Sequence, residues 1–110
     1  MSQFDLPQEH HIRTSTEFRK IMNEGTRLRC KHLTIHQLEN QLEVSRLGFI
    51  VSKKMGNAPR RNSIKRLWKE AFRLERKEFR LNCDYVLRFY PGYQLLSLSE
   101  LRQMLREIQT

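Results

Sequence analysis

The side chains able to perform acid–base, nucleophilic or metal chemistry are few and dispersed in this sequence of 110 residues. Asp5 and Asp84 are the only aspartates, and the glutamates are scattered along the chain. A nuclease that acts through protein groups needs clustered carboxylates to hold magnesium, or a histidine pair for acid–base work. His10 and His11 are adjacent, and adjacent side chains rarely converge on one ion without further ligands. The sequence therefore predicts no catalytic centre and no metal site in the protein, so any reactive centre would lie in a partner.

Positive charge is concentrated in one stretch, residues 53–80. Eleven lysines and arginines lie there against three glutamates, whereas the other residues hold ten against nine acidic side chains. Lysine and arginine neutralise phosphates and release condensed counterions, so this asymmetry is typical of a surface that meets a polyanion. The first functional hypothesis is therefore nucleic-acid binding.

A long helix is predicted to follow the loop at residues 53–59, which contains Gly56, Asn57 and Pro59. At about 100 degrees per residue, one arc collects basic side chains and one asparagine, with Phe72 at its edge, and the opposite side is apolar. The arc holds Arg61, Asn62, Lys65, Arg66, Lys69, Arg73, Arg76 and Lys77, and the apolar side holds Ile64, Leu67, Trp68, Ala71 and Leu74. A solvated face is the common explanation of a charged helix face, but such a face gains from acids that pair at i,i+4. Seven like charges repel one another instead, and a polyanionic partner relieves that repulsion.

Three segments before this helix have the periodicity of regular structure. A capping box at Thr14 to Glu17 predicts a short helix that stops at Gly25. Residues 29–38 and 47–51 alternate in polarity, which predicts two strands joined into a hairpin by a polar turn at residues 39–43. Leu33 and Ile35 share one face of the first strand. In the second strand, a glycine at position 48 indicates that another backbone or a ligand approaches closely.

Two further elements are expected after the long helix. Residues 83–90 alternate as a third strand, and a strand–helix–strand order demands a parallel crossover. Ser97 and Glu100 form a second capping box before an apolar stripe of Leu98, Leu101, Met104, Leu105 and Ile108. We therefore expect one α+β domain over residues 1–110, with helices mainly on one face of the sheet and residues 1–11 as an extended arm.

The cysteines and the hydropathy pattern indicate the compartment. Cys30 and Cys83 match no paired metal-ligand spacing, and the chain has no apolar leader or run of membrane length. We expect free thiols, no membrane partner and a cytoplasmic location.

The segment from Ile50 to Arg73, IVSKKMGNAPRRNSIKRLWKEAFR, resembles the signature of the bacterial ribonuclease P protein component. That signature is a strand ending in Ser-Lys-Lys, a Gly-Asn loop, Arg-Asn-Arg, a hydrophobic residue, Lys-Arg and an Arg-Glu-Ala-Phe-like continuation. The matching residues are Ser52, Lys53, Lys54, Gly56, Asn57, Arg61, Asn62, Ile64, Lys65, Arg66, Glu70, Ala71 and Phe72. Weaker similarity covers residues 12–108.

The resemblance implies a single two-layer αβββαβα domain of ribosomal-protein-like fold, with a left-handed βαβ crossover against the general right-handed expectation. The residue pattern resolves three strands, so the fourth would be a short one. The family binds a catalytic RNA and the single-stranded 5′ leader of precursor tRNA. In this family, magnesium bound by the RNA promotes cleavage of the leader. The resemblance therefore implies that this chain itself holds no cofactor and no catalytic residue. We expect one protein copy per RNA.

The resemblance also assigns residues to two surfaces. The surface for the catalytic RNA would comprise Lys53, Lys54, Arg60, Arg61, Asn62, Lys65, Arg66 and Lys69. The leader groove, between the sheet and the first helix, would comprise Arg13, Phe18, Met22 and His36. For Phe18 and Met22, helical periodicity alone favours core packing over a groove lining.

Departures from the family pattern bear on both surfaces. Relatives often carry aromatic residues where this chain has Met22 and His36, so stacking of leader bases would be weaker. The second arginine of Arg-Asn-Arg is Ser63, which falls outside the basic arc. Arg60 projects toward the opposite rim of the helix. The alternative function is that of a ribosomal-type RNA-binding protein without an enzymatic role. A DNA-binding helical module is disfavoured, because no scaffold helix precedes the long helix at the spacing of a short turn.

Overall fold

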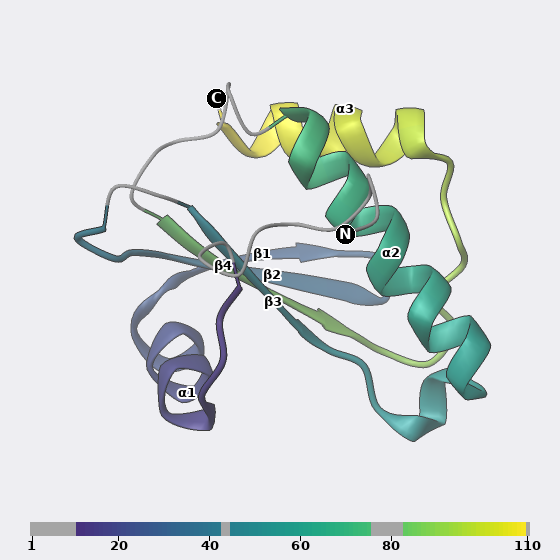
Figure 1. Ribbon diagram of the computed structural model, residues 1–110, viewed down its shortest axis with the longest axis horizontal. Coiled ribbons are helices and arrows are strands. Elements are labelled where there is room, and N and C mark those ends of the chain that lie inside the picture. Colours follow the sequence, from purple (N-terminus) through teal and green to yellow (C-terminus); the bar gives the residue numbers. More distant parts are fainter. Residues whose placement is uncertain (1–10, 43–44, 76–82, 110) are drawn as a thin grey trace.

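The computed structural model describes residues 11–42, 45–75 and 83–109 of the chain. Within these ranges the order is αβββαβα, as the resemblance implies (Figure 1). The elements are α1 (Ser15–Glu24), β1 (Thr26–Cys30), β2 (Leu33–Glu39), β3 (Arg46–Ile50), a short 3-10 helix η2 (Lys53–Met55), α2 (Ala58–Glu75), β4 (Cys83–Phe89) and α3 (Leu98–Gln109). The arm at residues 1–10 lies outside the described residues, whereas Ile12 is buried and its amide donates to the Leu47 carbonyl of β3.

The strands form one sheet in the order β1-β2-β4-β3. β4 pairs with β3 in parallel and with β2 in antiparallel orientation, which confirms the parallel crossover through α2. The predicted hairpin between β2 and β3 is wrong, because β4 lies between them. The consecutive residues Tyr85, Val86 and Leu87 of β4 are all buried. A strand with apolar side chains on both faces is stabilised by an interior position in the sheet, where both of its faces are covered.

The predicted strand at residues 29–38 is two strands. β1 and β2 form an antiparallel hairpin in which Cys30 pairs with Leu33, with Lys31 and His32 at the turn. The alternation of polarity runs through this turn without glycine, asparagine or proline, which are the usual turn signals. His32 adopts a φ of 58° there, a conformation that few residues other than glycine adopt. β1 is therefore the strand that the residue pattern did not resolve.

Helix α1 begins and ends where the sequence predicts. The Thr14 hydroxyl accepts from the Glu17 amide at 3.1 Å, and the Glu17 carboxylate returns to the Thr14 amide at 3.4 Å. Gly25 follows the helix with a φ of −79°, so its backbone is not left-handed. A Cβ at Gly25 would lie 2.6 Å from the carbonyl oxygens of Ile21 and Gln37, so close approach to β2 is what requires glycine.

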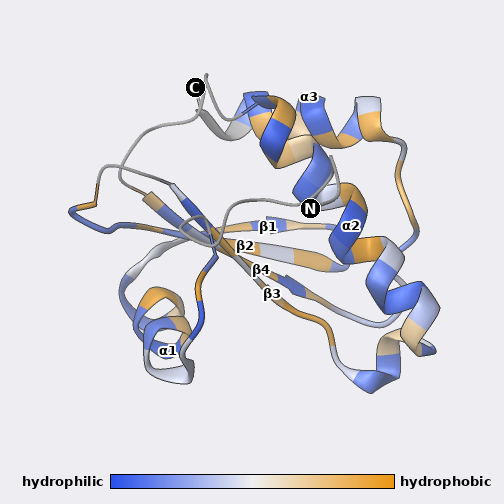
Figure 2. Ribbon diagram, viewed as in Figure 1, coloured by the Kyte–Doolittle hydropathy of each residue, from blue (hydrophilic) through white to orange (hydrophobic). Residues whose placement is uncertain are grey.

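The helices cover both faces of the sheet (Figure 1). The prediction of helices mainly on one face holds for α2 and α3, which enclose the larger core, whereas α1 packs on the opposite face over Val86. Trp68 and Phe72 of α2 are 1% exposed, and each such side chain contributes about 1.5–3 kcal/mol by leaving water. Figure 2 shows the hydrophobic residues on the strands and on bands of α2 and α3.

Two positions on α2 differ from the predicted faces. Phe72, predicted at the edge of the basic arc, is buried against Tyr85, with ring centroids 6.4 Å apart. Leu74, predicted in the core, is 37% exposed. The packing of α3 explains the shift, because α3 lies beside the end of α2 and its Leu101 and Leu105 contribute to the same core.

Helix α3 begins at its predicted capping box. Ser97 accepts from the Glu100 amide at 3.2 Å, and the Glu100 carboxylate accepts from the Ser97 amide at 3.2 Å. Leu101 and Leu105 are buried and Leu98 and Met104 are partly buried, as predicted, while the side chain of Ile108 lies outside the described residues. The apolar stripe of the sequence is therefore the face that packs on α2 and the sheet.

Candidate nucleic-acid interface

The solvent-facing side of α2 carries the predicted basic arc. Its buried side is Ile64, Trp68, Ala71 and Phe72, and the hydrophilic and hydrophobic bands of α2 are distinct in Figure 2. Of the predicted RNA-binding residues on this helix, Asn62 and Arg66 are exposed, while Arg60, Arg61, Lys65 and Lys69 are half-buried. Half-burial of such long side chains is compatible with function, since the stem lies on the protein and the charged end reaches water.

Part of the basic arc is neutralised within the protein. The Arg73 guanidinium contacts the Glu70 carboxylate at 2.6 Å and 3.0 Å, and this hydrogen-bonded pair raises the pKa of Arg73. Glu70 is 8% exposed, so the pair sits against the helix surface. Arg76 and Lys77, which complete the predicted arc, lie outside the described residues. The described cationic surface of α2 is therefore centred on its first three turns.

Lys53 and Lys54 extend this surface beyond the helix. Both are exposed on η2, immediately before α2, while Met55 beside them is buried at 4% exposure. The positive end of the α2 dipole lies next to these lysines. The dipole and the two lysine charges together favour binding of a phosphate. The loop of the sequence prediction is thus a short turn of helix, held by one buried methionine.

Two arginines at the start of α2 also hold the turn in place. Arg60 donates to the Met55 carbonyl at 2.9 Å and to the Tyr93 carbonyl at 2.6 Å. Arg61 donates to the Gly56 carbonyl at 3.2 Å. Arg60 therefore points toward the loop before α3, consistent with its predicted place on the opposite rim, and it bridges two loops. A sequence pattern shows its charge and not these carbonyl partners.

Three of the four predicted leader residues lie together on the face of the sheet that α1 covers, opposite α2. Phe18 and Met22 of α1 are partly buried against Ile21 and Val86. His36 lies on the same face of β2, because it pairs in register with Val86 of β4. Arg13 is exposed just before α1. The core packing that helical periodicity favours for Phe18 and Met22 is confirmed, and their place in a leader groove stays a prediction.

His36 is the least satisfied polar group among the described residues. It is 5% exposed, and its Nδ1 has no hydrogen-bond partner. Burial lowers the pKa of His36, and the positive charges of Arg27 and Arg88 lower it further. The imidazole is therefore neutral near neutral pH, and its buried Nδ1 has no hydrogen-bond partner.

The sheet face beside α1 adds basic side chains that the sequence reading did not identify. The register places Arg27 beside His36, and both Arg29 and Arg88 beside Thr34. The Arg88 guanidinium lies 5.4 Å from the ring centre of Tyr90. Had β1 been resolved as a strand, the alternation of Arg27 and Arg29 would have placed both on this face.

A shallow cavity of about 400 Å³ lies at the edge of this face. Arg27, Arg29, Thr34 and Tyr90 are among its lining residues. Arginines beside an aromatic ring are the side chains that hold single-stranded nucleic acid, through phosphates and stacked bases. The cavity lies at β1 and β2, on the part of the sheet beyond α1.

Other chemistry-bearing groups are dispersed in the described part of the chain. Residues 11–42, 45–75 and 83–109 contain no group of three histidines, cysteines or acids placed to hold a metal ion. Cys30 and Cys83 are free thiols, and burial raises the pKa of Cys30. Among the described helices, none is both long and apolar enough to cross a bilayer.

The structure is a small α+β protein that presents positive charge on two surfaces. One is the lysine- and arginine-rich side of η2 and α2, and the other is the sheet face that carries Arg27, Arg29 and Arg88. The chain belongs to the ribonuclease P protein family, whose model, described as Ribonuclease P, matches residues 6–110.

Individual relatives agree with this assignment. The chain is 41% identical over 87 residues to a ribonuclease P protein component of Syntrophus aciditrophicus, covering 79% of this chain and 73% of the relative. It is 37% identical over 103 residues to that of Desulfotalea psychrophila, covering 94% and 86%. The solved Staphylococcus aureus RNase P protein superposes with a TM-score of 0.77 at 25% identity, covering 90% of this chain and 94% of that structure. Family and fold therefore agree with the resemblance read from residues 50–73.

Proposed function

We propose that this chain is the protein subunit of ribonuclease P and assists the Mg-dependent removal of the 5′ leader from precursor tRNA. The observation that carries the proposal is the placement of the family signature, whose basic residues line η2 and the first turns of α2 on the side away from the core. The chemistry belongs to magnesium held by the catalytic RNA, and the protein contributes binding and orientation. It acts in the cytoplasm, one copy per RNA.

The catalytic RNA binds the surface formed by η2 and α2. Lys53, Lys54, Arg60, Arg61, Asn62, Lys65, Arg66 and Lys69 form this surface, and they contact RNA through phosphates and shape. Lys53, Lys54 and Lys65 act as cations. Arg60 has a second role, because two of its donors already hold the loops at Met55 and Tyr93.

The 5′ leader of precursor tRNA binds the groove on the other face. Phe18 supplies an aromatic edge, Met22 extends the apolar wall, and the buried His36 belongs to the sheet surface on which the leader lies. Arg13 lies at the entrance to α1, where it attracts the leader backbone. Because the sheet separates this groove from α2, one protein can hold the catalytic RNA and the substrate leader at once.

Reconstitution tests this function. Purified protein alone should not cleave precursor tRNA, and addition of the protein to its ribonuclease P RNA should permit cleavage at magnesium concentrations too low for the RNA alone. No gain in cleavage or in affinity for the precursor would refute the proposal. Co-sedimentation with ribosomes, with no precursor accumulating on depletion, would favour the ribosomal-type alternative.

A further inference from the structure

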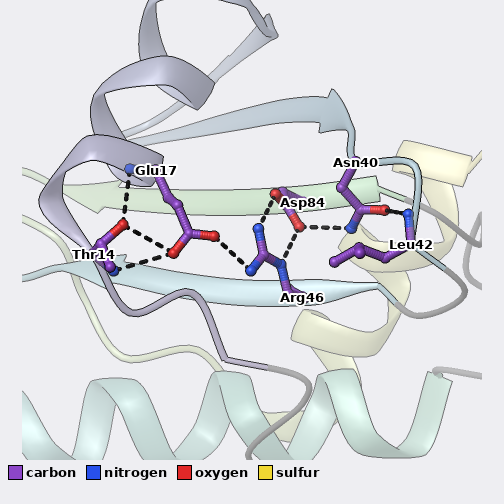
Figure 3. A network of polar contacts seen from close by, with 6 residues as sticks. All are labelled: Thr14, Glu17, Asn40, Leu42, Arg46 and Asp84. Atoms are coloured by element: carbon purple, nitrogen blue, oxygen red, sulfur yellow. Dashed lines mark hydrogen bonds and ion pairs between the residues drawn. The ribbon is translucent and has the colours of Figure 1, made fainter.

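A network of polar side chains joins α1 to the sheet beside the leader groove (Figure 3). Arg46 of β3 is at its centre. Its Nε and Nη2 donate to the two carboxylate oxygens of Asp84 at 2.8 Å and 2.7 Å, and its Nη1 contacts Glu17 of α1 at 2.6 Å. Asn40 donates to Asp84 at 2.7 Å and accepts from the Leu42 amide at 2.8 Å. One guanidinium therefore connects α1, β3 and β4, and Asn40 adds the loop after β2.

The centre of the network, at Arg46 and Asp84, is shielded from solvent. The side chains of Arg46 and Asp84 are 17% and 5% exposed, and that of Glu17 is 34% exposed. Burial alone would raise the pKa of Glu17, but hydrogen bonds with Arg46 and Thr14 hold it below its ordinary value. Partly buried, bidentate arginine–carboxylate contacts fix geometry better than exposed ion pairs.

We infer that Arg46 is a positioning residue for the leader groove, because its ion pair with Glu17 fixes where α1 lies on the sheet and hence where Phe18 stands. This inference rests on the proposed leader-binding function. Glu17 and Phe18 are consecutive on α1, and they meet Arg46 and Gly48, which are two apart on the same face of β3. α1 is thus attached to β3 at two successive points, one ionic and one apolar.

The two attachments differ in what they determine. Ile21, Val86 and Ile12 bury apolar surface beneath α1, and such burial is non-directional. The Glu17–Arg46 contact is directional, and Asp84 holds Arg46 from its other side. A slide of α1 along β3 would break the ion pair before it exposed the apolar contacts. Loosening this pair should therefore change the groove more than it changes the fold.

The test uses reconstituted holoenzyme carrying Glu17→Gln or Arg46→Lys. Each substitution removes the charge or the forked geometry while retaining a polar group. We expect the ratio of precursor to mature tRNA affinity to fall about fivefold, the size typical of residues that modulate a site without contacting the ligand. Affinity for the catalytic RNA should stay unchanged, and hydrogen exchange at the amides of α1 should become faster.

Glu75→Gln is the matched control. Glu75 is also a buried acid paired with arginines, Arg102 and Arg106, but it joins α2 to α3 on the opposite face of the sheet. The substitution Glu75→Gln should lower stability while leaving the ratio of precursor to mature tRNA affinity, and hydrogen exchange in α1, unchanged. If Glu75→Gln lowers the ratio as much as Arg46→Lys does, general destabilisation explains the effect and the inference fails.

Phe18→Ala separates this inference from the function on which it rests. If Phe18→Ala lowers the affinity ratio and both Glu17→Gln and Arg46→Lys leave it unchanged, the leader groove stands and the positioning role of Arg46 is refuted. If Phe18→Ala also leaves the ratio unchanged, the leader groove itself is wrong. A fall in the ratio for Phe18→Ala, Glu17→Gln and Arg46→Lys, with the control unaffected, supports both.

Discussion

The ring of Phe18 lies directly over Gly48, so that a Cβ at position 48 would stand 2.6 Å from its Cζ and 2.7 Å from its Cε1. Gly48 lies in the interior of β3, and its φ is not among the positive values. The glycine is therefore required for space. The close approach predicted at position 48 is confirmed, but the neighbour is a side chain of α1 and not the backbone or ligand that the sequence predicted.

Gly48→Ala should displace Phe18 and lower both stability and precursor selection. The added methyl group meets an aromatic ring and the Cβ of Ile12, which gives the cost of an overpacked core, about 1–3 kcal/mol. Urea unfolding measures the stability, and affinities for precursor and mature tRNA measure selection. The double variant Gly48→Ala with Phe18→Ala should lose less stability than the two single variants lose together, because the clash is gone, and it should recover none of the selection. Additive losses of stability would show that the two residues act independently.

The charge of α2 should set the salt dependence of binding to the catalytic RNA. Lys65→Ala or Arg61→Ala removes one phosphate contact, so the slope of log affinity against log salt concentration should become shallower by about one. The matched control is the double variant Glu70→Gln with Arg73→Gln, which removes a salt bridge on the same helix at no change in net charge. That variant should keep the slope. An unchanged slope for Lys65→Ala would place the RNA elsewhere.

Glu75 should make stability depend on pH in the acid range. Burial alone would raise the pKa of Glu75, but hydrogen bonds from Arg102 and Arg106 hold it below its ordinary value of 4.5. A carboxylate with a lowered pKa in the folded state stabilises above its unfolded pKa, and this stability is lost as pH falls through the folded value. Glu75→Gln should therefore lower the free energy of unfolding by about 2 kcal/mol near neutral pH. The difference in free energy of unfolding between variant and wild type should shrink as the pH falls below 4.5, the ordinary pKa of a glutamate. Urea unfolding at several pH values measures it, and a difference independent of pH would contradict the ion-pair explanation.

Local sequence signals predicted the helices of this fold well. The capping boxes at Thr14 and Ser97 each depend on side chains within four residues of one another, so they are visible in the sequence and recur in the structure. The basic and apolar sides of α2 were readable for the same reason. Phe72 and Leu74 differ because α3, a distant segment, decides which part of the end of α2 is buried.

Strand pairing and the polar networks could not be read in this way. The hairpin at Lys31 and His32 lacks the usual turn residues, and the insertion of β4 between β2 and β3 depends on contacts between distant segments. The groove residues Arg27 and Arg88 come together only through that strand order. Arg46 likewise looks like an ordinary polar position in β3 until Glu17 and Asp84 are placed around it. Sequence reasoning therefore predicted the contacts that are local in the chain and located the family signature, whereas contacts between distant segments required the structure.

His36 should weaken the fold as the pH falls through the range in which histidine titrates. Burial and the charges of Arg27 and Arg88 lower its pKa from the ordinary value of 6.5. The unfolded chain therefore takes up the proton at a higher pH than the folded chain, and stability is lost as pH falls below that ordinary value until the folded pKa is reached. His36→Gln keeps a polar side chain but cannot titrate, so the difference in free energy of unfolding between wild type and variant should shift against wild type between about pH 7 and about pH 5. If wild type gained stability relative to His36→Gln on acidification, the pKa of His36 would be raised in the fold, and burial beside Arg27 and Arg88 would not be what sets it.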